Sequence, residues 1–62
     1  MLTRAQHKRL SHVLEQAGRC VLGDWDEQFV ADMAARLKRF GHELTVTDRQ
    51  WIEIDRIEGK HL

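Results

Sequence analysis

The sequence has no proline, a single cysteine and no long uninterrupted apolar run. The lone cysteine, Cys20, cannot form a disulfide within the chain, which fits a reducing compartment. Apolar residues make up 42% and charged residues 32%, a mixture too apolar for a disordered chain and too interrupted by charge for a membrane span. No apolar signal-peptide core begins the sequence. We therefore expect a cytoplasmic protein with no membrane partner.

Net charge of either sign is also missing, because ten basic residues balance ten acidic ones. The balance is uneven along the chain: residues 1–22 hold four basic residues against one acidic residue, and residues 23–62 hold six against nine. A domain dedicated to nucleic acid usually carries a clear basic excess. The sequence indicates at most a local basic patch near its start.

A chain of 62 residues is long enough for one domain, 1–62, and for a small core only. Domains of this size often gain stability from disulfides, metals or oligomerisation. No internal disulfide can form here, so self-association, such as a homodimer, remains open.

Hydrophobic periodicity predicts an all-α fold, a compact three-helix domain with helices at about 4–17, 25–40 and 48–58. Gly18 and Gly41 suit the left-handed residue that often ends a helix. Each helix is preceded by a candidate capping box, in which two side chains satisfy free N–H groups of the first turn. These boxes are Thr3 with Gln6, Asp24 with Glu27, and Thr47 with Gln50.

The apolar positions of the second and third helices predict one shared core, centred on the two tryptophans because of their large area. Its expected members are Trp25, Phe29, Met33, Leu37, Trp51 and Ile54. Val46 precedes the third cap and Trp51 follows it, the arrangement of a hydrophobic staple. Ile52 projects away from this stripe and is a candidate interface residue for a dimer or another partner.

No residue pattern points to catalysis, to a cofactor or to a metal. His7 and His12 are five residues apart, which places them about 140° apart around a helix. Cys20 has no second cysteine at zinc-finger spacing. Ser11 adjoins His12, but adjacent helical residues do not face each other as a nucleophile and base must. We predict that the protein is not an enzyme and binds no cofactor.

The first helix carries basic residues in its first two turns, where the helix dipole prefers acids. Arg4, Lys8 and His12 share one face, with Arg9 beside them. The cluster is either an ordinary solvated face or a candidate contact for an anionic partner. Such a partner would be a phosphate backbone or an acidic protein surface.

About half of the chain, from the second helix into the third, resembles a short helical segment found in uncharacterised phage and prophage proteins. Similar segments occur in the tails of some replication-associated helicases and primases. The resemblance implies a setting in mobile elements and nucleic-acid metabolism, and it carries no catalytic residue. Val46 stands where that segment usually has leucine. The matching residues are Trp25, Phe29, Val30, Asp32, Met33, Arg36, Leu37, Gly41, Leu44, Thr47, Gln50, Ile54 and Ile57.

Three functions remain open at this point. A protein-interaction module, an adaptor or modulator that binds another protein, fits the neutral charge and the small size best. A DNA-binding helix-turn-helix protein is weaker, because the connection at 41–46 exceeds the usual three or four residues and the third helix holds four acids. A structural assembly subunit is the third alternative.

Overall fold

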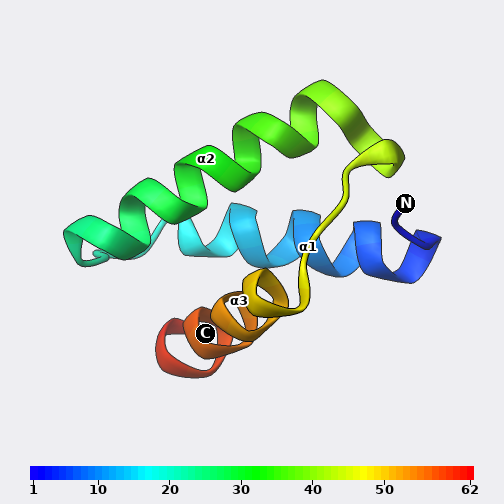
Figure 1. Ribbon diagram of the computed structural model, residues 1–62. Helices are drawn as coiled ribbons and strands as arrows, with labels where there is room; N and C mark the ends of the chain where they lie inside the picture. Colours follow the sequence, from blue (N-terminus) through cyan, green and yellow to red (C-terminus); the bar gives the residue numbers. More distant parts are fainter.

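A computed structural model describes all 62 residues. It contains three α-helices and no strand (Figure 1). Helix α1 spans Arg4–Ala17, α2 spans Asp24–Phe40, and α3 spans Asp48–His61, with a short 3-10 helix, η1, at Gly41–Glu43 before α3. The predicted all-α three-helix architecture is confirmed. Helix α3 continues three residues past its predicted end because Gly59 is tolerated inside it, and Lys60 and His61 suit the negative end of its dipole.

Two of the three expected capping boxes begin α1 and α3. The Gln6 N–H donates to the Thr3 hydroxyl at 3.1 Å, and the Thr3 N–H donates to the Gln6 side chain at 2.9 Å. Thr47 and Gln50 repeat this exchange at 3.2 and 2.9 Å. Both starts are therefore local features that the sequence determines directly.

The start of α2 and the end of α1 differ from the sequence-based expectation. Gly23 is the cap of α2, and Asp24 is its first residue and makes no capping bond, so the predicted box of Asp24 with Glu27 is wrong. Asp24, Asp26 and Glu27 still stabilise this first turn, because their carboxylates lie at the positive end of the helix dipole. Gly18 keeps a right-handed φ of −63°, whereas Gly41 ends α2 with the expected positive φ of 56°.

Helix α1 is the centre of the fold, because both other helices pack on it. Its buried stripe is formed by Leu10, Val13, Leu14 and Ala17. Helix α2 runs back along α1 in the opposite direction, and α3 crosses below them (Figure 1). The Leu2 N–H donates to the His42 carbonyl at 2.8 Å, which fixes the start of α1 beside the end of α2.

The expected core is correct in part. Met33 and Ile54 are fully buried, and Phe29, Leu37 and Trp51 are half-buried against them. Trp25 was wrongly placed in the core, because its side chain is 59% exposed. At this end of α2 the inward positions belong to Asp26 and Val30, and Trp25 lies at the edge of the stripe. It stacks on Phe29 at 5.3 Å instead, with the Arg56 guanidinium 5.7 Å from its ring.

An ion pair joins α2 to α3. Both terminal nitrogens of Arg56 donate to the buried carboxylate of Asp26, one of them at 3.2 Å. These hydrogen bonds hold the pKa of Asp26 below its ordinary value and raise the pKa of Arg56. The buried Nε2 of His61 lies 3.8 Å from the same carboxylate. The start of α2 is thus anchored to the last two turns of α3.

Replacing Asp26 by Asn should lower stability at neutral pH and leave it almost unchanged in acid. The pKa of folded Asp26 lies below the ordinary 3.8, so the pair stabilises the fold above that value and ceases to do so as the pH falls through the folded pKa. Urea midpoints of wild type and Asp26→Asn should differ at about pH 7 and converge in acid, once the pH lies below the folded pKa of Asp26. Asp32→Asn, which breaks an exposed pair with Arg36, is the control and should change little at either pH. An equal loss for Asp26→Asn at both pH values would refute the ion pair's role.

Candidate functional site: the groove between α1 and α2

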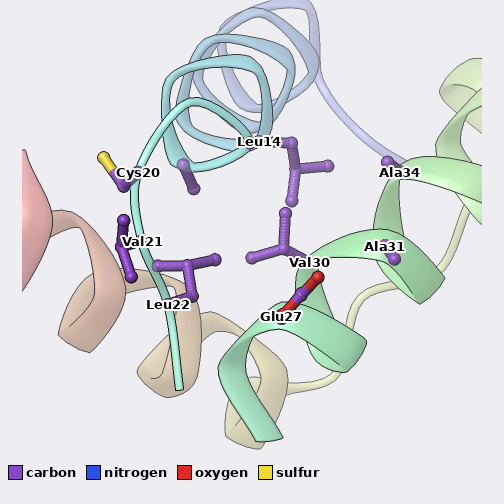
Figure 2. Close-up of a pocket in the computed structure, with 10 residues that line it drawn as sticks. Leu14, Cys20, Val21, Leu22, Glu27, Val30, Ala31 and Ala34 are labelled. Atoms are coloured by element: carbon purple, nitrogen blue, oxygen red, sulfur yellow. The ribbon is translucent and has the colours of Figure 1, made fainter. Parts of the chain in front are cut away.

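A groove of about 490 Å³ opens between the end of α1, the connection at 18–23 and the first half of α2. Figure 2 shows Leu14, Leu22 and Val30 pointing into the same space from these three segments. Eight of its ten lining residues are hydrophobic, so the groove offers apolar surface rather than polar groups. The lining consists of Leu14, Ala17, Gly18, Cys20, Val21, Leu22, Glu27, Val30, Ala31 and Ala34.

The local sequence explains why this space stays open. Leu22 packs against the core and draws the connection inward, while its neighbour Val21 is left 97% exposed at the rim. On the opposite wall, Ala31 and Ala34 are too small to fill the space between the helices. An exposed valine beside small residues leaves apolar surface uncovered in this groove.

The polar groups of the groove are few. Glu27 is the only charged residue in the lining. The Cys20 thiol donates weakly to the carbonyls of Gln16 and His61, at 3.5 and 3.7 Å, which tie it to α1 and α3. The only hydrogen bonds of the thiol are to these carbonyls, and nowhere in the chain do three His, Cys, Asp or Glu side chains group as metal ligands do. The surface of the groove is therefore chiefly apolar.

The basic face predicted on α1 is divided by the fold. Arg4, Lys8, Arg9 and His12 are all exposed, but Arg9 turns toward α3. Its guanidinium donates to Asp55 and, at 3.1 Å, to Glu58, and these bonds raise the pKa of Arg9. The same group lies 5.7 Å from the Trp51 ring. Arg9 therefore holds α3 against α1, which sequence reasoning missed because its partners lie more than 40 residues away.

The other three residues of that face make no ion pair. Arg4, Lys8 and His12 point to solvent from one side of α1 with no acidic partner. They form a smaller cationic surface than the four residues that the sequence indicated. Whether this surface meets an anionic partner stays a prediction.

Ile52 is 63% exposed, as its position off the apolar stripe of α3 predicted. It stands one turn before Arg56 on α3, on the side of the molecule where Trp25 emerges. A shallow hollow of about 270 Å³ adjoins Trp25 and Phe29 there. A role for Ile52 in a dimer or another interface stays a prediction.

The groove itself was not found by sequence reasoning. Its signals are an apolar pair, Val21 and Leu22, in a connection bounded by Gly18 and Gly23, and two small residues on the facing helix. Each signal is weak alone, because an exposed valine or alanine is common on any surface. They gain meaning only once α1 and α2 lie side by side.

Comparisons of the chain with protein-family models, curated proteins and solved structures find no match. None of its helices is both long enough and apolar enough to span a bilayer.

Two neighbouring cations on α1 should contribute differently to stability. Arg9→Gln removes the bonds to Asp55 and Glu58 and should lower the free energy of unfolding by up to about 1 kcal/mol, less at high salt. Lys8→Gln removes an unpaired charge and should change stability by less than about 0.5 kcal/mol. Urea denaturation at two salt concentrations measures both. Equal losses for the two variants would contradict the assignment of Arg9 to the fold and Lys8 to the free surface.

Proposed function

We propose that the protein is a small non-catalytic protein-interaction module, an adaptor or modulator, and that the groove between α1 and α2 is its binding site. The observation that carries the proposal is the open apolar groove with Val21 almost fully exposed at its rim. Burying such a residue stabilises a complex by removing apolar area from water. In the free chain the side chain of Val21 stays exposed to water, so its apolar area remains available for contact with a partner.

The shape of the groove favours a protein segment over a small molecule. Small-molecule sites usually combine an enclosing cavity with a few convergent polar groups. Here the groove runs between two helices, and its rim is built from Val21 on the connection and from small residues on α2. A groove of this form suits an amphipathic helix that lays its apolar side chains between two others.

DNA binding through α3 is less well supported. Asp55 and Glu58 pair with Arg9, and Glu53 pairs with Arg56, so most charges of α3 are already engaged within the chain. A helix that enters the major groove needs free cations near the phosphates. The similarity to phage and prophage segments leads us to propose a partner from a mobile element or from nucleic-acid metabolism, with the contact made to protein.

A substitution inside the groove should abolish partner binding without unfolding the chain. Ala31→Arg places a long charged side chain in the groove at an exposed helix position, so the helix should persist. Ala5→Arg makes the same change at an exposed alanine outside the lining. Quantitative mass spectrometry of proteins captured from a host lysate should show a partner retained by wild type and Ala5→Arg and lost by Ala31→Arg. Identical capture by all three chains, each with unchanged circular dichroism, would refute the groove as the binding site.

A further inference from the structure

Two rows of residues border the groove at the spacing of a coiled-coil seam. On α2 the row is Glu27, Ala31, Ala34 and Lys38, separated by four, three and four residues. The first three of these line the groove. Residues at this alternating spacing share one helix face, and small residues there allow another helix to approach closely.

The matching row on α1 extends far beyond the groove. It consists of Arg4, Lys8, Ser11, Glu15 and Gly18, separated by four, three, four and three residues, and only Gly18 lines the groove. The row therefore leads from the apolar end of α1 back to its first turn. We call these two rows together the track, and the groove lies at one end of it.

The track has one apolar end and one basic end. The bond from Leu2 to His42 places the start of α1 beside the end of α2, so Arg4 and Lys8 share that end with Lys38. None of these three cations makes an ion pair in the structure. The other end carries the groove. There Glu27 has no basic partner, and Arg19 pairs with Glu15 at 3.4 Å.

We propose that the occupant of the track is an amphipathic helix of a partner protein, with apolar residues at heptad spacing at one end and Asp or Glu residues at the other. The apolar end fills the groove, and the acidic end meets Arg4, Lys8 and Lys38. This inference rests on the proposed function and specifies the chemistry of the partner. It also accounts for the cations in the first turns of α1, where the dipole disfavours them, because a bound acidic segment compensates the penalty.

A second copy of this chain fits the track poorly. Two copies related by a twofold axis would pack their tracks against each other in opposite directions. The apolar end of one track would then cover the basic end of the other. Glu27 of one copy would then meet a cation of the other, but the apolar lining around Val21 would face Arg4 and Lys8 instead of apolar side chains, which is costly. A partner helix that carries its own acids avoids this cost.

Selection from a peptide library tests the charge pattern. The probe is a displayed library of helical peptides about five turns long, with leucine fixed at heptad positions of one half and the other half randomised. Selection on the wild-type chain should enrich Asp and Glu in the randomised half. Selection on Arg4→Glu/Lys8→Glu should enrich Lys and Arg there instead. Arg49→Glu/Lys60→Glu changes the net charge equally on α3, outside the track, and should enrich acids as the wild type does.

Individual selected peptides give the quantitative readout. Their affinity for Arg4→Glu/Lys8→Glu should fall about tenfold at low salt, and much less at high salt, because exposed ion pairs are weak and screened. Ala31→Arg should abolish their binding. Peptides that need the groove but show no charge preference would overturn this inference and leave the proposed function intact.

Other results would count against both proposals. These are the absence of any enriched peptide, and enriched peptides that bind Ala31→Arg as well as wild type. Sedimentation of the free chain over a hundredfold concentration range tests the other possible occupant of the track, a second copy of the chain. A dimer that Ala31→Arg dissociates would show that the track is filled by a second copy, which contradicts the inference.

Discussion

The fold depends on one apolar stripe of α1, to which both other helices are packed. Leu10, Val13, Leu14 and Ala17 are buried there, and Met33 of α2 and Ile54 of α3 complete the same core. Each helix alone could not bury its apolar side. With so few core residues, polar links at the edges position the helices, chiefly Asp26 with Arg56 and Arg9 with Asp55 and Glu58. These links engage Asp55, Arg56 and Glu58 of α3.

A central helix with two neighbours leaves its remaining side exposed. Helix α3 covers one flank of α1, and the groove opens on another flank, between α1 and α2. Three short helices cannot surround one another completely, so a domain of this size exposes apolar surface by geometry. Part of that surface lies in the groove, which Val21, Ala31 and Ala34 line together. The groove thus exposes apolar surface while the core residues stay buried.

Most local features were predictable from the sequence, except the start of α2 and the conformation of Gly18, whereas contacts between distant charged residues were not. The boxes at Thr3 and Thr47 and the positive φ of Gly41 depend on neighbours in the chain, and so they follow the expected rules. Trp25 shows where periodicity fails. It sits at the edge of the apolar stripe, and packing gave the inward position to Asp26, a buried acid whose partner is 30 residues away.

In the candidate site too, features of a single helix were predictable from the sequence, and features shared by several segments were not. The position of Ile52 followed from one helix and is confirmed as exposed. The basic face of α1 was recognised as a cluster, but only the fold shows that Arg9 belongs to the α1–α3 contact. The groove is shared by α1, the connection and α2, so no single segment could reveal it.

Methyl NMR of the chain, recorded before and after addition of a captured partner, tests the central claim most directly. Val21, Ala31 and Ala34 carry methyl groups in the groove, and Ile52 carries methyl groups on α3, outside the lining of the groove. The account predicts that the groove resonances shift or broaden on binding and that those of Ile52 stay unchanged. Shifts at Ile52, with unchanged resonances for Val21, Ala31 and Ala34, would contradict it.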